Sequence, residues 1–397
     1  MTDEAGRRRR IVIVGAGAAG LATAIFAARA NPKLSIALLD GAEKIGAKIL
    51  ISGGGRCNIT NVKVTPEDYW GGSRNTIKRV LAALSEEKTA AFFREIGVPL
   101  HEEQWGKLFP DSNQARSVLD ALVREAKHCG VELKAGHRVT AIAKGFKVAT
   151  SKGELEAERV VLATGGLSIP KTGSDGGGYA LAKSLGHSII PTTPALAPLT
   201  IERTADLAGV THEVELTVRV DGGKETLLGS MLWTHFGVSG PVAMNASRVW
   251  HRAKVENRPV TVTANFAPGV DIEAELLRSK GKAANVIAKW IPSRLAEKLA
   301  PDVMLSHLTK EQRRDLVRAV TEFPMGVTGT RGYNYAEATA GGVPLDEIDP
   351  RTMESRLCPG LHFVGEILDV DGRIGGFNFQ WAWSSGFVAG NALARTP

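Results

Sequence analysis

The chain of 397 residues has few cysteines, and its three, Cys57, Cys129 and Cys358, lie far apart in the sequence. An odd number of widely spaced thiols builds neither a disulfide framework nor a C-x-x-C zinc site. The missing C-x-x-C pair also argues against the dithiol chemistry of disulfide reductases. We therefore expect a reducing, cytoplasmic environment and no bound metal.

Aromatic residues are also scarce, at 6%, whereas 43% of residues are hydrophobic and 23% are charged. This ordinary globular composition excludes wholesale disorder, collagen and coiled coil. Glycine is the one excess, with 44 residues. Several of the few aromatic residues gather in the short stretch 377–383, near the C-terminus.

No long hydrophobic run is free of glycine. Residues 11–30 are mostly apolar and follow the basic stretch 7–10, as in a signal peptide or membrane anchor. Gly15, Gly17 and Gly20 interrupt the run, and a buried strand that leads into a helix explains them better. We therefore expect no membrane partner.

The three glycines form the pattern G-x-G-x-x-G between the apolar run 11–14 and a small-residue helix. In dinucleotide-binding folds the first glycine permits a tight turn, the second lets the backbone approach a pyrophosphate, and the third lets helix and strand pack closely. Asp40 closes a second apolar run, 34–39, where a carboxylate would accept hydrogen bonds from ribose hydroxyls. The pattern predicts a dinucleotide site and does not distinguish FAD from NAD.

Three further segments bear on that choice. In 48–61, Lys48 and Arg56 flank the glycines 53–55, whose backbone N–H groups could bind anionic oxygens. A buried strand ends in 164–166, at the edge of a parallel sheet where ligands bind. Glu366 closes another strand and could hold ribityl hydroxyls. Gly376 opens a helix whose N-terminus would face the flavin's pyrimidine end.

Several prolines follow residue 190, and beyond them polar and apolar residues alternate as in strands. These features indicate that residues 191–330 are inserted into a domain formed by both ends of the chain. The net charge of +7 is concentrated in residues 251–320, which carry 13 Lys and Arg against 8 Asp and Glu. Such a basic stretch is typical of RNA binding or of a solvated helical face. Charge alone leaves both open.

Together, the segments GAGAAG, SGGGRCNITN, ATGGLSIPKTGSDGGGYALAKSLGH, WTHFGVSGP and GEILDVDGRIGGFNFQWAWSSG resemble the BaiN/RdsA family of NAD(P)/FAD-dependent oxidoreductases. The resemblance covers about residues 10–393 and is weakest across 250–320. It implies an α/β fold: a Rossmann-like FAD-binding domain of the glutathione-reductase type (1–190 and 331–397). An inserted β-barrel-like domain (191–270 and 321–330) and a helical subdomain (271–320) complete it.

The resemblance also implies which residues lie against non-covalently bound FAD. Val139 would offer its backbone to adenine, and Asn378 and Gln380 would neighbour the flavin ring. The full predicted set is Gly15, Gly17, Ala19, Gly20, Asp40, Lys48, Gly54, Arg56, Cys57, Asn58, Val139, Thr164, Gly165, Gly166, Gly365, Glu366, Asp369, Gly376, Asn378, Phe379 and Gln380.

Candidates for proton transfer are His235, Cys57 and Lys171. A histidine titrates near neutral pH, a thiol near the flavin could protonate a carbanion, and a lysine could bind an acidic substrate. A structural role is about as plausible for His235 and Lys171, and a packing role is commoner for a cysteine. The chain has no second strand–GxGxxG–helix unit, so either NAD(P)H docks transiently at the flavin or the electrons come from another donor.

The favoured function is FAD-dependent reduction of an activated C=C bond of a small molecule, by hydride transfer from flavin N5. An RNA-modifying flavoenzyme, similar to a ribosomal RNA dihydrouridine synthase, is the alternative, with RNA held by 251–320. An amine oxidase that uses oxygen and a non-catalytic flavin-binding module also remain open.

Overall fold

The computed structural model describes residues 10–395, so expectations that concern residues 1–9 lie outside the described residues. The chain forms two compact units. The first contains the chain up to Thr192 and from Glu337 onward, and the second is Thr193–Ala336. The sequence placed these boundaries after residues 190 and 330. Residues 331–336 join the second unit because Arg331 donates its N–H to the Pro198 carbonyl and stacks on Phe236.

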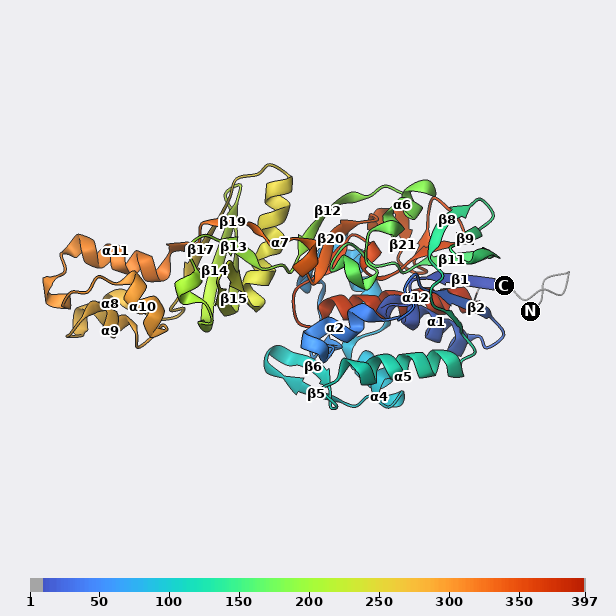
Figure 1. Cartoon of the computed structure of the whole chain (residues 1–397), viewed down its shortest axis with the longest axis horizontal. Coiled ribbons are helices and arrows are strands. Elements are labelled where there is room, and N and C mark those ends of the chain that lie inside the picture. Colours follow the sequence, from blue (N-terminus) through green and yellow to red (C-terminus); the bar gives the residue numbers. More distant parts are fainter. Residues whose placement is uncertain (1–9, 396–397) are drawn as a thin grey trace. The chain divides into compact units, whose positions relative to one another are not determined.

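A seven-stranded sheet forms the centre of the first unit (Figure 1). Its order is β21 (Ile348–Asp349), β22 (Glu354–Ser355), β23 (Leu361–Phe363), β11 (Arg159–Leu162), β1 (Arg10–Val14), β2 (Ser35–Leu39) and β7 (Glu132–Lys134). The five strands from β23 to β7 pair in parallel. The apolar runs of β1, β2 and β11 are typical of strands that helices cover on both faces. The two ends of the chain thus share one sheet.

Two helices from opposite ends of the sequence pack side by side: α1 (Ala18–Ala30) and α12 (Phe377–Arg395). Small residues allow this approach. A Cβ added at Gly386 would lie 2.9 Å from the Ala19 carbonyl oxygen, and one at Gly390 would lie 2.8 Å from that of Thr23. The aromatic residues near the start of α12 are buried, including Trp381 and Trp383.

The remaining elements of the first unit surround this core. The helices are α2 (Ala47–Gly55), α3 (Arg74–Ala83), α4 (Glu86–Glu95), α5 (Ala115–His128) and α6 (Gly177–Ser184). The short strands are β3 (Thr60–Asn61), β4 (Tyr69–Gly71), β5 (Leu100–Glu103), β6 (Lys107–Pro110), β8 (Val139–Ala143), β9 (Lys147–Thr150), β10 (Gly153–Glu156) and β24 (Val370–Gly372). α3 and α4 are separate because Ser85 caps α4, where its hydroxyl accepts a hydrogen bond from the Lys88 N–H.

The second unit has its own antiparallel sheet. Its order is β18 (Phe323–Pro324), β17 (Val260–Asn265), β14 (Thr211–Val220), β15 (Gly223–Thr234), β16 (Gly237–Ser239), β13 (Leu199–Ile201) and β19 (Val327–Thr330). Alternation along β14 buries Val214, Leu216 and Val218 on the face against which α7 (Pro241–Val255) packs. The chain leaves the first unit within β12 (Ile190–Ala195) and returns just before β20 (Ala338–Gly342).

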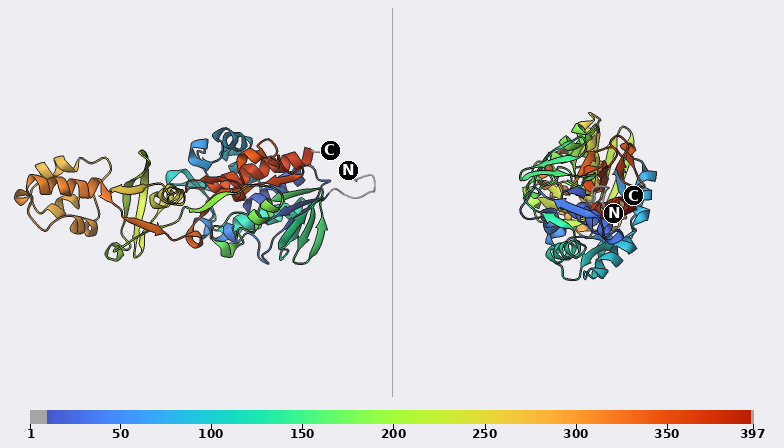
Figure 2. Two further views of the ribbon diagram at one scale, coloured as in Figure 1. Left: turned by 90° about the horizontal axis from the view of Figure 1, so that it is seen from above. Right: turned by 90° about the vertical axis from the view of Figure 1, so that its right-hand side faces the viewer.

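Helices α8 (Ile272–Arg278), α9 (Ala283–Ile287), α10 (Ser293–Leu299) and α11 (Lys310–Thr321) gather at one end of the second unit (Figures 1 and 2). Leu276, Val286 and Leu295 are buried between them. No helix within residues 10–395 is long and apolar enough to cross a membrane.

Candidate active site

The carboxyl ends of four parallel strands place the predicted motifs along one edge of the sheet of the first unit. β1 leads into the glycine loop, β2 into Asp40, β11 into 163–166 and β23 into 364–366. Ligands of open α/β sheets bind at this edge. Segments far apart in sequence therefore meet there because the strands are parallel.

The glycine loop has the geometry that a pyrophosphate requires. Gly15 has a φ of +105°, and a side chain there would collide with the Ala163 carbonyl oxygen. A side chain at Gly20 would collide with the Gly15 carbonyl oxygen. At Gly17, by contrast, a Cβ would meet no atom within 4 Å. The backbone at Gly15 and Gly20 is therefore closely packed against the protein, whereas Gly17, just before α1, faces open space.

Asp40 supports this loop from the end of β2. One of its carboxylate oxygens accepts a hydrogen bond from the Ala16 N–H at 2.8 Å, and the other accepts one from the Ala42 N–H at 2.8 Å. The carboxylate therefore lies directly beside the glycine loop, and its role as a ribose ligand stays a prediction. Both oxygens retain lone pairs for a further donor.

Lys48 and Glu366 form a polar cluster with Ser168 at the same edge. The Lys48 Nζ lies 2.6 Å from Glu366 Oε2 and donates to the Ser168 hydroxyl at 2.7 Å. Glu366 Oε1 accepts hydrogen bonds from the Ser168 hydroxyl at 2.6 Å and from the Thr339 N–H at 2.8 Å. The cluster joins α2, the loop after β11, β20 and the short turn after β23.

This cluster keeps Glu366 ionised. Burial by itself would raise the pKa of this carboxyl group, but the adjacent Lys48 ammonium and the hydrogen bonds from Ser168 and Thr339 outweigh it. The net result is a pKa below the ordinary value. Neither Ser168 nor Thr339 was among the predicted site residues. Ser168 lies within the segment ATGGLSIP, and that position was the only signal available.

The Arg56 side chain, which follows α2, has partners within the protein. The Arg56 guanidinium lies 2.5 Å from Glu103 Oε1 and 4.1 Å from the centroid of the Phe109 ring. These contacts hold it against the β5–β6 hairpin. Gly54 has a φ of +69°, and a Cβ there would meet no atom within 4 Å. The open space in this segment therefore lies beside Gly54, and the Arg56 side chain packs against the hairpin instead.

Cys57 and Asn58 both face the interior. The Cys57 side chain is completely buried, and burial raises the pKa of its thiol to about 12. The thiol is therefore neutral and has no access to solvent. With its amide oxygen turned toward the start of α12, Asn58 accepts a hydrogen bond from the Gly376 N–H at 3.0 Å and donates to the Thr60 carbonyl. Asn58 thus fixes the glycine that opens the helix.

The polar side chains at the start of α12 are occupied within the protein. Asn378 both accepts from the Gly372 N–H at 2.8 Å and donates to the Gly372 carbonyl at 2.9 Å. Gln380 is buried, accepts from the Thr60 hydroxyl and donates to the Leu84 carbonyl. Phe379 stacks on Trp383. Any contact of Asn378 or Gln380 with a flavin would therefore be additional to these bonds.

The other predicted cofactor residues lie in the same unit. Gly165 and Gly166 are packed tightly, since a Cβ at the first would lie 2.6 Å from the Ser174 hydroxyl. Gly365 has a φ of +74° and lies against Ala19 of α1. Val139 begins β8, and Asp369 lies just before β24.

Two of the candidates for proton transfer are exposed. Lys171 lies in a short turn, Pro170–Thr172, of the first unit. His235 lies in the turn between β15 and β16 of the second unit, edge-on to Phe236. Their roles, like that of buried Cys57, stay predictions.

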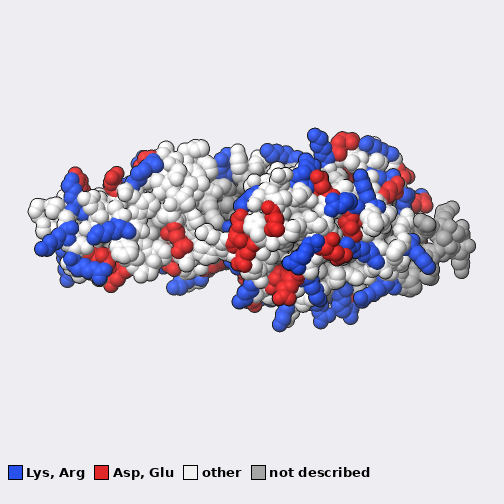
Figure 3. All heavy atoms as spheres, turned by 90° about the horizontal axis from the view of Figure 1, so that it is seen from below, with Lys and Arg blue, Asp and Glu red and all other residues white. Residues whose placement is uncertain are grey.

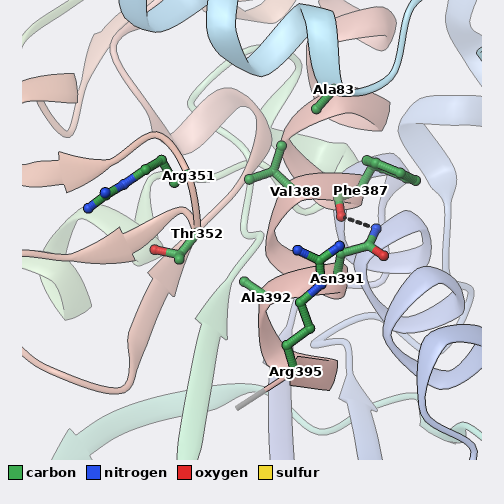
Figure 4. A pocket seen from close by; sticks show the side chains of 8 residues that line it. All are labelled: Ala83, Arg351, Thr352, Phe387, Val388, Asn391, Ala392 and Arg395. Atoms are coloured by element: carbon green, nitrogen blue, oxygen red, sulfur yellow. Dashed lines mark hydrogen bonds between the residues drawn. The ribbon is translucent and has the colours of Figure 1, made fainter.

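A separate hollow of about 390 Å³ lies near the C-terminal part of α12 (Figure 4). It is lined by Ala83, Arg351, Thr352, Phe387, Val388, Asn391, Ala392 and Arg395. None of these belongs to the predicted cofactor set. The hollow is therefore distinct from the glycine loop and the Lys48–Glu366 cluster.

A family model described as the HI0933-like protein Rossmann domain matches residues 9–392. The chain belongs to the HI0933-like family. It is 35% identical to a ribosomal RNA dihydrouridine synthase of Escherichia coli, over 96% of this chain and 97% of the relative. It is equally 35% identical to a 3-dehydro-bile acid delta(4,6)-reductase of Clostridium scindens, over 98% and 100%.

Among solved structures, the quinol fumarate reductase subunit FrdA of E. coli shares the fold. Its TM-score is 0.52 at 17% identity, covering 98% of this chain and 70% of that one. This likeness and the family model confirm the Rossmann-type fold expected from the sequence. The family and its curated relatives confirm the FAD cofactor and the oxidoreductase class. This member of the HI0933-like family is a FAD-dependent oxidoreductase.

The glycine loop fits the pyrophosphate of FAD. The first hydrogen bond of α1 runs from the Leu21 N–H to the Gly17 carbonyl, so the preceding amides have no partner within the helix. Those amides and the partial positive charge of the helix end favour an anion. Close by, the Thr164 hydroxyl is buried without a hydrogen-bond partner among the described residues. Such an atom is expected where a polar ligand completes the site.

Proposed function

We propose that the protein reduces a C=C bond conjugated to a carbonyl group of a small molecule, with FAD as the hydride carrier and NAD(P)H as the electron donor. The observation that carries the proposal is the likeness to relatives matched over nearly their whole length. One is named a delta(4,6)-reductase and the other a dihydrouridine synthase. Both names describe saturation of a C=C bond next to a carbonyl group.

The chain's own residues would hold the cofactor in defined places. The amides at the start of α1 would bind the pyrophosphate, and Asp40 would accept hydrogen bonds from the ribose. Glu366, kept ionised by Lys48, would accept them from the ribityl chain. When bound, FAD would take a hydride from the nicotinamide and pass it to one carbon of the substrate's double bond.

A uracil base in ribosomal RNA is the second candidate substrate, because the E. coli relative is named for that product. The basic insert gives this reading limited support. Lys282 pairs with Asp302 at 2.7 Å, Lys298 pairs with Asp206 at 2.5 Å, and Arg294 donates to the Ala208 carbonyl at 3.2 Å. On the face drawn in Figure 3, basic side chains over both units are mixed with acidic ones. We therefore favour the small molecule.

Anaerobic stopped-flow spectroscopy tests the proposal. The purified protein would be reduced with NADH or NADPH, and the flavin absorbance would be followed. A steroid dienone, a small cyclic enone or a uridine-containing ribosomal RNA fragment would then be added. Rapid reoxidation by an enone with formation of the saturated ketone is the expected result. Reoxidation by RNA alone, with dihydrouridine detected by mass spectrometry, would favour the second candidate. Reoxidation by none of the three would overturn the proposal.

A further inference from the structure

Glu337 is a carboxyl group of the first unit that the cofactor assignment leaves unused. It immediately precedes β20, its side chain is exposed, and it makes no hydrogen bond or ion pair with the described residues. Thr339, two residues further on, donates its N–H to Glu366 Oε1, and its hydroxyl accepts from the Leu167 N–H at 2.8 Å. Two residues of extended chain span roughly 6.6 Å. Glu337 therefore lies a short distance from the Lys48–Glu366 cluster.

The surroundings of Glu337 favour its protonated form. Water reaches the side chain, but neighbouring protein atoms displace much of its hydration, and this desolvation raises the pKa of the carboxyl group. Lys107, on β6, is the charged group that acts on Glu337, and it lowers this pKa by less than desolvation raises it. A carboxyl group with a raised pKa is a candidate for proton transfer when it also lies near a ligand site.

The β5–β6 hairpin that carries Lys107 is fixed to the start of α12. Asn61 donates one hydrogen bond to the Trp105 carbonyl at 3.0 Å and another to the Gly375 carbonyl at 3.1 Å. Trp105, at the tip of the hairpin, has a φ of +66° and is 57% exposed. A large side chain in a left-handed conformation is strained, and such strain clusters at ligand sites. The hairpin that carries Lys107, the cation that acts on Glu337, is thus tied to the segment just before α12, where the flavin ring is expected.

We propose that Glu337 is the proton donor of the reduction. The inference rests on the proposed function. Hydride addition to the β-carbon of the conjugated double bond breaks the π bond and moves its electron pair onto the carbonyl oxygen as an enolate. The O–H proton of Glu337 then bonds to the α-carbon, and the enolate electrons form that C–H bond. The resulting carboxylate is exposed and recovers its proton from water.

The experiment uses the FAD-loaded variant Glu337→Gln, with Asp346→Asn as the matched control. Asp346 is another exposed carboxylate of the same unit that has no hydrogen bond or ion pair with residues 10–395. Both variants should bind FAD and be reduced by NAD(P)H at the wild-type rate. Reoxidation by the enone should slow by about 10²–10⁴-fold in Glu337→Gln, the contribution typical of a general acid, and stay unchanged in Asp346→Asn. Glu337→Asp should recover part of the loss.

A second readout does not depend on turnover. In protein labelled with ¹³C at the glutamate carboxyl groups, NMR should detect one group that titrates above the ordinary range and is absent from Glu337→Gln. Lys107→Met should move this titration to higher pH, because a stabilising cation is lost. The inference on Glu337 would be overturned if Glu337→Gln were reoxidised at the wild-type rate. It would also be overturned if this variant showed the same carboxyl titrations as wild type. Neither result would affect the proposed function. A wild-type protein that reduces no conjugated C=C bond would overturn the proposed function as well.

Discussion

At the scale of single residues, Gly17 separates cofactor binding from folding. Its φ of −82° suits any residue, and a Cβ there would meet nothing within 4 Å. We expect Gly17→Val to fold normally but to lose FAD, because the branched side chain occupies the space of the pyrophosphate. Flavin absorbance and the melting temperature of the apoprotein measure the two effects. Normal FAD content in this variant would contradict the phosphate assignment.

Lys48 is expected to stabilise the fold through Glu366. Lys48→Met leaves the partly buried Glu366 carboxylate without its cation. We expect a loss of about 2 kcal/mol in the free energy of unfolding, between the values for surface and buried ion pairs. Combining it with Glu366→Gln should restore part of that loss, because the double variant buries no unpaired charge. Urea unfolding of the apoprotein measures all three variants. Equal losses in Lys48→Met and in the double variant would show that the two side chains are not coupled.

The same pair predicts a pH dependence. The pKa of Glu366 is lowered from 4.5 in the folded protein, so its stabilising contribution is present above about pH 4.5. The contribution is lost as the pH falls through the folded-state pKa. We therefore expect the difference in unfolding free energy between wild type and Glu366→Gln to shrink at acid pH. A difference that stays constant from pH 7 to pH 3 would contradict this.

The sequence predicts where the motifs lie in the fold better than it predicts the hydrogen-bond partners of their side chains. Gly15, Gly17 and Asp40 were predictable because strand, loop and helix are consecutive in sequence. The partners of Arg56, Asn378 and Gln380 were not, because Glu103, Gly372 and Thr60 lie in other segments of the chain. A charged or amide side chain in a motif says nothing about which distant group will engage it.

At the scale of elements, α1 and α12 depend on small residues at their contact. Gly390→Leu would place its Cβ 2.8 Å from the Thr23 carbonyl oxygen, which belongs to backbone and cannot move aside. We expect a loss of about 3 kcal/mol or more in unfolding free energy, the upper part of the range for overpacking. Ala394→Leu, one turn further along the less buried end of α12, is the control and should cost far less. A melting temperature equal to that of wild type would contradict the close packing.

The helical elements also show where pattern reading fails. Apolar residues recur at helical spacing through 75–97, and this spacing alone predicts amphipathic helix throughout. In the structure α3 ends before the buried Leu84, and Ser85 caps a new helix, α4. Both helices keep the same apolar spacing, so periodicity alone does not reveal the break. Only the capping residue does. In the segment 48–61, the residues before Ser52 are helical as part of α2, whereas Gly53 and Gly54 have positive φ.

At the scale of the whole molecule, the surface charge of the insert distinguishes the two candidate substrates. Lys280 and Lys289 are exposed and have no partner among the described residues. For a small-molecule enzyme, Lys280→Glu with Lys289→Glu should leave turnover unchanged. For an RNA enzyme the double variant should weaken RNA binding and flatten its salt dependence by about 0.7–0.9 per lost phosphate contact. Lys33→Glu with Lys88→Glu, on the first unit, is the control.

The sharing of one sheet by both ends of the chain also has a consequence for synthesis on the ribosome. β1, β2, β7 and β11 emerge first, then the whole inserted unit, and only at the end β23, Glu366 and α12. The inserted unit is one continuous stretch of chain, so its sheet can form completely before β23 is made and pairs with β11. Until β23 has been made, the edge of β11 exposes unpaired backbone groups to any other nascent strand. The FAD site is therefore complete only after Glu366 and α12 have been made.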